Sequence, residues 1–249
     1  MPDNNRGALS AFLARISRRS VLDGDEIEAI LSLPTIEHRV RANQDIVRLG
    51  ERIDHACLVV EGLVGRFGQT SSGERQIIAL HIPGDMADLH SVVSPLVTVP
   101  LQALTASTII RIPHVALRKI AARHPAVATA FWRDCMIDLA IMAQWLLSIG
   151  RRSAKARLAH LLCEMALRYE QIGACSSEGF LFPATQNHIG DALGLTAVHV
   201  NRMFGALKRD GLIDVKGREI TINDGKGLAA VSEFDPAYLQ FEALDLHQR

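Results

Sequence analysis

The sequence contains few cysteines and no pairing pattern among them. Its 249 residues include four cysteines that lie far apart and form no C-x-x-C pair, so neither a zinc site nor a disulfide framework is predicted. They are Cys57, Cys135, Cys163 and Cys175. The first residues also lack the basic and then apolar layout of a signal peptide. Buried thiols in a reducing compartment explain this usage best, and we therefore expect a cytoplasmic protein.

Uninterrupted hydrophobic runs and catalytic motifs are missing as well. Residues 91–110 carry no charge over 20 residues, but Pro95, Pro100 and several hydroxyl side chains interrupt them. This composition predicts a loop leading into a buried strand rather than a membrane helix. We find no paired catalytic carboxylates, nucleophile motif, phosphate-binding glycine loop or metal-ligand spacing. The sequence therefore predicts neither a membrane protein nor an enzyme, and it predicts no metal site.

The net charge is zero, with 27 basic and 27 acidic residues, and gives no sign of a nucleic-acid partner. The distribution of charge is more informative. Residues 151–218 contain ten basic and six acidic side chains, whereas residues 219–249 contain two basic and six acidic ones. A basic block followed by an acidic tail is compatible with nucleic-acid binding by the block, although solvated surfaces often differ by this much.

The most informative segment is residues 185–204, where two short helical patterns meet at Gly194. Thr185 and Thr196 stand where a hydroxyl can cap a helix, and Gly194 can adopt the left-handed conformation that ends one. The pattern is typical of a DNA-binding helix-turn-helix, and the alternative is an ordinary helical hairpin with capped ends. The small core that would lock the two helices together consists of Ile189, Leu193, Leu195, Val200 and Met203.

The first half of the chain predicts helices and then short strands. Residues 9–33 predict one or two helices with Asp23 as a cap, and a further helix is expected over residues 114–124. Between them, short β-prone runs separated by Gly and Pro predict an all-β barrel or sandwich. The runs are residues 45–49, 56–60, 63–67, 76–82 and 101–112.

Pro125 opens the most regular helical pattern, at the N1 position that tolerates a missing N–H. Apolar residues then recur at alternating spacings of four and three, which is the pattern of a two-chain coiled-coil interface. The residues are Ala128, Trp132, Cys135, Leu139, Met142, Leu146 and Ile149, and we expect the last six to form a dimer interface. The alternative is packing within one subunit, because Phe131, Ile141 and Trp145 add a second apolar surface.

Residues 150–153 (Gly-Arg-Arg-Ser) are expected to break this helix, and Ser153 is expected to cap the next one, which leads to the helix pair. Behind the pair, alternating residues around Lys216 and Gly217 predict a β-hairpin wing.

In this order the elements resemble the Crp–Fnr family of bacterial transcription regulators, the relatives of the cyclic-AMP receptor protein. Four blocks carry the resemblance, at residues 43–50, 60–62 (Val-Glu-Gly), 83–85 (Pro-Gly-Asp) and 189–213. The resemblance implies an α+β fold with a cyclic-nucleotide-binding-type β-roll. It implies a sensor domain with N-terminal helices (1–124), a dimerisation helix and hinge (125–150), a winged helix-turn-helix (151–224) and an acidic C-terminal tail (225–249).

The resemblance also implies partners: double-stranded DNA, a second copy of the chain, and RNA polymerase. The homodimer would place two recognition helices in successive major grooves of a pseudo-palindromic site. Carried over by position, Arg202 is expected to donate to guanine, Asn201 to pair with adenine, and Val198 to contact a thymine methyl group. Phosphate contacts that fix the register without reading bases are expected from Gln186, Thr196, His199, Lys216 and Arg218.

The effector is not readable from the sequence. Cyclic-AMP binders carry a Glu and then an Arg-Ser pair after Pro-Gly-Asp, whereas this chain has Asp88-Leu89 and Val97-Thr98. Because a phosphate buried without a cation is costly, this argues against cyclic AMP in the usual mode. The first cysteine is Cys57, which argues against the N-terminal iron–sulfur cluster of the family. Haem stays open, with His90 the best placed of the candidates His55, His81, His90 and His114.

Two other functions are compatible with the sequence. One is a β-roll protein that binds a small molecule and carries an incidental helical domain. The other is a scaffold protein that uses the winged domain and the acidic tail to bind protein instead of DNA. Binding that depends on salt but is indifferent to sequence would favour the scaffold.

Overall fold

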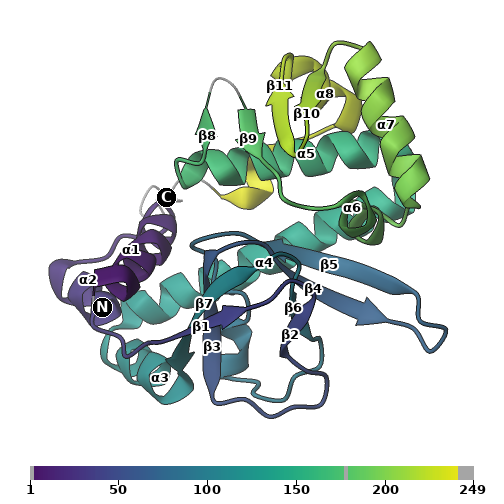
Figure 1. Cartoon of the computed structure of the whole chain (residues 1–249). Coiled ribbons are helices and arrows are strands. Elements are labelled where there is room, and N and C mark those ends of the chain that lie inside the picture. The colour runs from purple at the N-terminus through teal and green to yellow at the C-terminus, as the bar shows by residue number, and fades with distance from the viewer. Residues whose placement is uncertain (1–2, 177–178, 241–249) are drawn as a thin grey trace. The chain divides into compact units, whose positions relative to one another are not determined.

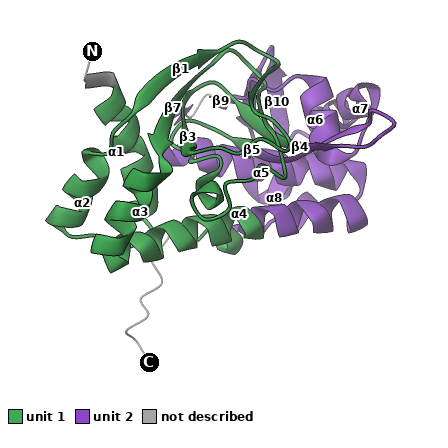
Figure 2. Cartoon of the chain, turned by 90° about the horizontal axis from the view of Figure 1, so that it is seen from below, with its two compact units in different colours: residues 1–66, 80–140, 237–249 green, residues 67–79, 141–236 purple. Residues whose placement is uncertain are grey.

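The computed structural model describes residues 3–176 and 179–240 (Figure 1). The chain forms two compact units (Figure 2). The first comprises residues 1–66, 80–140 and 237–249, and the second comprises residues 67–79 and 141–236. Within the described ranges, no helix is both long enough and apolar enough to cross a membrane.

The first unit begins with two helices, α1 (Asp3–Ser17) and α2 (Gly24–Leu31). Asp23 caps α2 as predicted: its carboxylate accepts a hydrogen bond from the Glu26 N–H at 2.9 Å, and the Glu26 carboxylate accepts one from the Asp23 N–H. This reciprocal capping fixes the start of the helix. A helix of only eight residues has marginal stability on its own, so the cap helps to stabilise it.

Seven strands follow, and they form two sheets with the orders β1-β7-β3 and β2-β6-β4-β5. Their bounds are β1 (Ile36–Val40), β2 (Gln44–Val47), β3 (His55–Glu61), β4 (Val64–Gln69), β5 (Arg75–His81), β6 (Leu101–Ala103) and β7 (Ser107–Pro113), with a 3₁₀ turn η1 (Leu89–Val92) after β5. The expected strand over residues 101–112 was wrong as a single element. It splits where the N–H groups of Leu104 and Thr105 donate to the carbonyl of Leu63, so that β6 and β7 join different sheets.

Two helices follow the strands: α3 (His114–Arg123) and α4 (Pro125–Arg151). The helix α3 lies where it was predicted. The break predicted at residues 150–153 is present: α4 ends at Arg151, with Gly150 inside its last turn, and Ser153 caps the next helix. A single glycine lowers the stability of a helix by only about 1 kcal/mol relative to alanine, so the helix can continue through Gly150.

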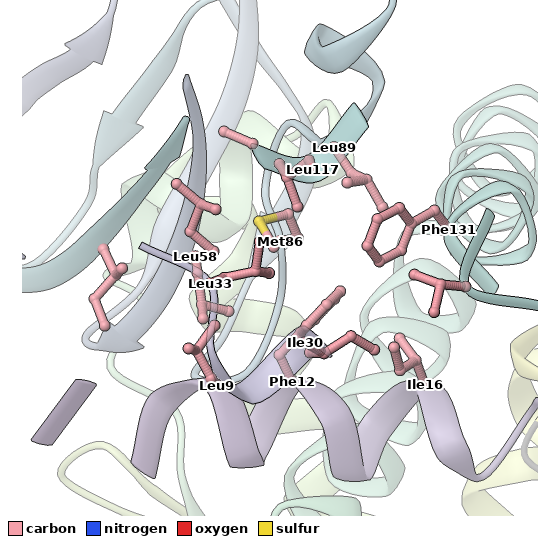
Figure 3. Close-up of a cluster of buried hydrophobic side chains, with 14 of the residues drawn as sticks. Leu9, Phe12, Ile16, Ile30, Leu33, Leu58, Met86, Leu89, Leu117 and Phe131 are labelled. Carbon is pink, nitrogen blue, oxygen red and sulfur yellow. The ribbon is translucent and has the colours of Figure 1, made fainter. Parts of the chain in front are cut away.

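Strand β3 separates two hydrophobic cores. Leu58 faces a cluster made with α1, α2, α3 and the start of α4, in which Phe12, Met86 and Phe131 are buried (Figure 3). Its sequence neighbours Cys57 and Val59 face the other cluster, between the two sheets. Because successive residues of a strand point to opposite faces, an almost continuous apolar run in β3 indicates burial on both sides.

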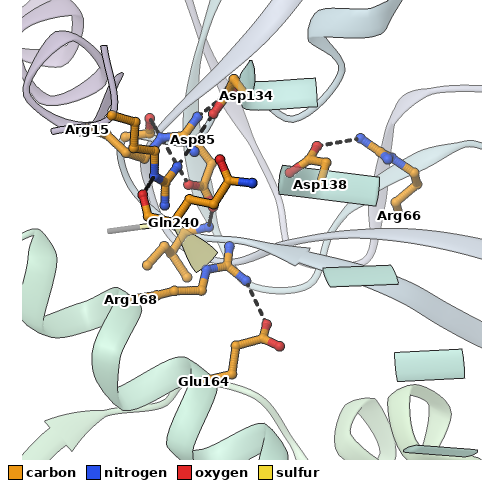
Figure 4. A network of polar contacts seen from close by, with 11 residues as sticks. Arg15, Arg66, Asp85, Asp134, Asp138, Glu164, Arg168 and Gln240 are labelled. Carbon is orange, nitrogen blue, oxygen red and sulfur yellow. Dashed lines mark hydrogen bonds and ion pairs between the residues drawn. The ribbon is translucent and has the colours of Figure 1, made fainter. Parts of the chain in front are cut away.

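A buried ion-pair network joins α1 to the turn after β5 and to α4 (Figure 4). The Arg15 guanidinium lies 2.7 Å from the Asp134 carboxylate and 3.5 Å from the Asp85 carboxylate. Asp85 also accepts a hydrogen bond from the N–H of Ile82. The last residue of the Pro-Gly-Asp block thus stabilises its own turn and anchors α1.

The second unit contains α5 (Ala154–Gln171), α6 (Gln186–Leu193), α7 (Ala197–Arg209) and α8 (Gly225–Ser232). A four-stranded sheet has the order β10-β11-β9-β8, from β8 (Cys175–Ser176), β9 (Gly179–Leu181), β10 (Ile213–Lys216) and β11 (Glu219–Ile222). The predicted wing is β10 and β11. Part of the expected tail is structured, because it contains α8 and a 3₁₀ turn η2 (Pro236–Leu239), and its residues 241–249 lie outside the described residues.

Candidate nucleic-acid interface

The helix pair α6–α7 has the predicted caps. The Thr185 hydroxyl accepts a hydrogen bond from the His188 N–H at 3.1 Å, and the Thr196 hydroxyl accepts one from the His199 N–H at 3.2 Å. Gly194 ends α6 in the left-handed conformation, with φ 64° and ψ 43°. These local signals were readable from the sequence because each cap depends on residues no more than three positions away.

A second glycine of the pair, Gly190, was not singled out by the sequence. The turn after α6 passes directly over it, and the Leu195 N–H donates to the Gly190 carbonyl at 3.0 Å. A Cβ atom on Gly190 would lie 2.4 Å from the Leu195 backbone oxygen. The absence of a side chain at this position therefore sets how closely the turn can approach α6.

Gly190→Ala is expected to destabilise the second unit by about 1–3 kcal/mol, because the backbone of the turn must move to admit the methyl group. The measurement is thermal unfolding of the full chain. Gly205→Ala in α7 is the matched control, since a Cβ there meets only the end of the Arg209 side chain, at 3.4 Å. Equal unfolding temperatures for the two variants would contradict the close approach at Gly190.

The outward face of α7 carries the residues that were predicted to read bases. Val200 and Leu207 are buried, whereas Val198 is 74% exposed and Asn201 and Arg202 are exposed. Among the described residues, the side chains of Asn201 and Arg202 make no hydrogen bond or ion pair. Their polar groups are thus available to a ligand, and no competing contact has to be broken first.

The residues that were predicted to contact phosphates surround this face. Gln186 and Thr196 are exposed at the N-terminal ends of α6 and α7, and His199 is half-buried. Lys216 and Arg218 are exposed on either side of Gly217, which forms the tip of the wing with a positive φ of 66°. Helix N-termini and cations are both favourable positions for phosphate groups.

The C-terminal end of α6 is held by residues distant in the sequence. The Gln76 side-chain amide donates to the Ala192 carbonyl at 3.0 Å, and Arg157 donates to the Leu193 carbonyl at 3.0 Å. The Arg75 guanidinium lies 3.8 Å from the Asp191 carboxylate. These contacts satisfy carbonyl groups that a helix leaves free at its C-terminus. No sequence signal indicated them, because Arg157 lies 36 residues before its partner, and Gln76 lies 116 residues before its own.

The predicted interface residues on α4 differ in exposure. Trp132, Leu139 and Leu146 are 69%, 51% and 74% exposed, whereas Cys135, Met142 and Ile149 are half-buried. The residues one position later, Met136 and Ala143, are exposed instead. The exposed ridge is therefore Trp132, Met136, Leu139, Ala143 and Leu146, which retains the alternating spacing of four and three.

The structure divides the effector candidates between two cores and the surface. Leu89 lies in the core with α1, Val97 lies in the core between the sheets, and Thr98 and His90 are exposed. Asp88 is buried, and its carboxylate accepts a hydrogen bond from the Cys57 N–H at 2.6 Å. Burial raises the pKa of Asp88 to about 6. Asp88, which stands where cyclic-AMP binders carry a Glu, thus supports the start of β3 with its carboxylate.

The histidine candidates are mostly engaged in the fold. His114 is buried, with its Nε2 atom 2.8 Å from the Ser91 hydroxyl, and the His55 Nδ1 atom lies 2.9 Å from the Asp54 carboxylate. His81 is buried as well. In the ranges that the structure covers, no three His, Cys, Asp or Glu side chains are grouped as metal ligands.

Comparisons with known proteins agree with this geometry. Residues 156–231 match the Crp-like helix-turn-helix domain, and residues 37–124 match the cyclic nucleotide-binding domain. The chain belongs to the Crp–Fnr family. The α+β fold that was predicted from the resemblance is confirmed.

Individual members of the Crp–Fnr family cover most of the chain. The transcriptional activator protein FnrA of Stutzerimonas stutzeri is 25% identical over 211 residues, which are 85% of this chain and 86% of that protein. The regulatory protein HlyX of Actinobacillus pleuropneumoniae is 29% identical over 184 residues, 74% of this chain and 76% of that protein. The structure of FixK2 from Bradyrhizobium japonicum has a TM-score of 0.74 and 27% identity, and it covers 82% of this chain and 100% of FixK2.

This Crp–Fnr protein is therefore a transcription regulator with a DNA-binding helix-turn-helix domain, and it is not an enzyme. The outward face of α7 is its candidate DNA-reading surface.

Proposed function

We propose that the chain acts as a homodimer and reads a pseudo-palindromic DNA site with one α7 helix in each half-site. The observation that carries this proposal is the exposed face of α7, where the side chains of Asn201 and Arg202 make no hydrogen bond or ion pair with other described residues. A major groove is wide enough for such a helix, and each base pair presents a distinct pattern of donors and acceptors there.

The three central residues have different roles in this proposal. The guanidinium fork of Arg202 donates two hydrogen bonds to O6 and N7 of guanine, a geometry that a lysine cannot reproduce. The amide of Asn201 pairs with N6 and N7 of adenine. Val198, 74% exposed, offers only an apolar surface, which is suited to a thymine methyl group. The half-site should therefore contain guanine, adenine and thymine at the positions these side chains reach.

Backbone contacts set the register in this proposal. Lys216 and Arg218 bring two cations to the tip of the wing, and Gln186, Thr196 and His199 lie near the N-terminal ends of α6 and α7. Such contacts add affinity without sequence information, and each cation that neutralises a phosphate adds to the salt dependence of binding.

Self-association through α4 would supply the second reading helix. The ridge from Trp132 to Leu146 exposes five apolar residues at coiled-coil spacing along one side of the helix. Exposed apolar surface of this size and regularity is unusual in a monomer, and a second copy of the same helix is complementary to it by symmetry. We also propose that the DNA-bound dimer contacts RNA polymerase in the cytoplasm, since the relative FnrA is a transcriptional activator protein.

The proposal is tested by binding of the full chain to DNA from upstream of its own and neighbouring genes, at two salt concentrations. Lys216→Ala is expected to weaken binding to specific and random DNA about equally and to reduce the slope of log affinity against log salt by about 1. Binding that depends on salt but shows no preference among the fragments would contradict base reading. It would favour the scaffold function instead.

A further inference from the structure

A cavity of about 300 Å³ lies between the recognition helix α7, the start of α6 and the wing. This volume is at the lower end of the range for small-molecule sites, about 300–1,000 Å³. All of its lining residues belong to the second unit. The cavity therefore does not depend on how the two units are arranged.

The walls of the cavity are mainly apolar. Phe182, Ile189 and Ile220 are almost completely buried, and Phe204 and Val215 are half-buried beside them. No side chain of residues 3–176 or 179–240 fills the space between them. An apolar space of this kind is favourable for the hydrocarbon part of a ligand, because filling it restores van der Waals contacts that the lining lacks.

The residues at the rim are polar, and two of them are cationic. Arg218 and Lys208 line the cavity together with the side-chain amides of Gln186 and Asn201. Lys208 lies 3.3 Å from the Asp214 carboxylate, which is itself 68% exposed, whereas the Arg218 side chain makes no hydrogen bond or ion pair with other described residues. An apolar interior below a free guanidinium and two amides fits a molecule with a compact apolar body and one anionic group.

We propose that this cavity binds a small amphiphilic anion, such as an aromatic or medium-chain carboxylate, and that the bound anion competes with DNA. The binding half of this inference is independent of the proposed function. The competition half rests on it, because Gln186, Asn201 and Arg218 line the cavity and are also the proposed contacts to DNA. One guanidinium cannot serve a carboxylate and a phosphodiester in the same geometry at once.

The cavity can be filled from α7 without changing a residue that reads DNA. Asn201, Gly205 and Lys208 share one face of the helix, since they are separated by four and three positions, and all three line the cavity. A side chain at Gly205 would therefore extend into the space. Its Cβ would meet only the flexible end of Arg209, at 3.4 Å. Gly205→Leu fills the cavity, whereas Gly205→Ala leaves most of it open and is the matched control.

The experiment uses the full chain and the fluorescent anion anilinonaphthalene sulfonate, titrated by fluorescence and by calorimetry. We expect one saturable site per chain, which is retained in Gly205→Ala and weakened about tenfold or more in Gly205→Leu. Equal affinity of the two variants would overturn the assignment, since the probe would then bind another apolar surface, such as the α4 ridge. Loss of the site in Gly205→Ala as well would overturn it too, because the cavity would not be the cause.

The competition is measured with the wild-type chain and Gly205→Ala, by titrating a specific DNA fragment in the presence and absence of the probe. We expect the apparent dissociation constant for DNA to rise linearly with the concentration of free probe, and DNA to displace the probe. Simultaneous binding of both would overturn the competition. If the chain bound no DNA fragment at all, the proposed function would fail, while the result on the cavity would stand separately.

Discussion

Replacing Arg202 with alanine is expected to weaken binding to the specific site by about 1–3 kcal/mol and to relax selection for guanine at one position of each half-site. The side chain is exposed on α7 and makes no hydrogen bond or ion pair with other described residues, so its loss should not disturb the fold. Binding to random DNA should change far less, because a bidentate contact to a base edge contributes little there. The measurement is competition binding with a panel of half-site variants at one fixed salt concentration.

Two controls separate base reading from charge. Arg202→Lys keeps the charge but loses the planar fork, and it should lose most of the selectivity for guanine. Arg209→Ala removes a cation from the exposed last turn of the same helix and should leave the base preference unchanged. A uniform loss of affinity for specific and random DNA in Arg202→Ala would show that Arg202 contacts phosphate and not guanine.

Leu139→Glu on α4 should dissociate the dimer and have the largest effect on specific binding. In the proposed interface two copies of residue 139 approach each other, so the variant places two carboxylates in an apolar seam at a cost of several kcal/mol. A monomer binds one half-site at a time. It loses the gain in affinity that comes from linking two DNA-binding domains, which is a factor of about 10²–10⁴. Sedimentation equilibrium measures the first effect, and binding to complete sites and isolated half-sites measures the second.

The matched control is Val93→Glu, which places the same charge on an apolar residue that is 81% exposed outside α4. It should remain dimeric. A dimeric Leu139→Glu protein with normal DNA affinity would refute self-association through this ridge. Met136→Glu further distinguishes the exposed ridge from the sequence-predicted seam, because the seam has Cys135 where the ridge has Met136.

The sequence predicted those parts of the protein that depend on short-range signals. Thr185, Thr196 and Gly194 define the ends of the helix pair through contacts within a few residues, and the structure has each of them as predicted. Strands β2 to β5 and the wing were found in the same way, from short runs between turn residues, whereas β8 and β9 were not predicted. Strand β1 was missed because its exposed, polar residues carry no apolar alternation, and only pairing with β7 defines it.

Long-range contacts account for what the sequence did not show. The crowding at Gly190 arises from a turn that folds back on α6, and the contacts of Gln76 and Arg157 arise from segments far apart in the chain. On α4, heptad spacing identified Trp132, Leu139 and Leu146 but could not decide whether Cys135 or Met136 is the outward neighbour. That choice depends on which side of the helix the rest of its own chain covers.

The hydrogen bonds at the C-terminal end of α6 limit which part of this protein can be exchanged as a separate domain. Its last two carbonyl groups receive their hydrogen bonds from Gln76 and Arg157, and only Arg157 lies within residues 151–224. A chimera that transplanted those residues onto a foreign sensor would leave the Ala192 carbonyl without its donor and Asp191 without Arg75. Any such exchange between regulators should therefore carry the hairpin of residues 67–79 along with the reading domain.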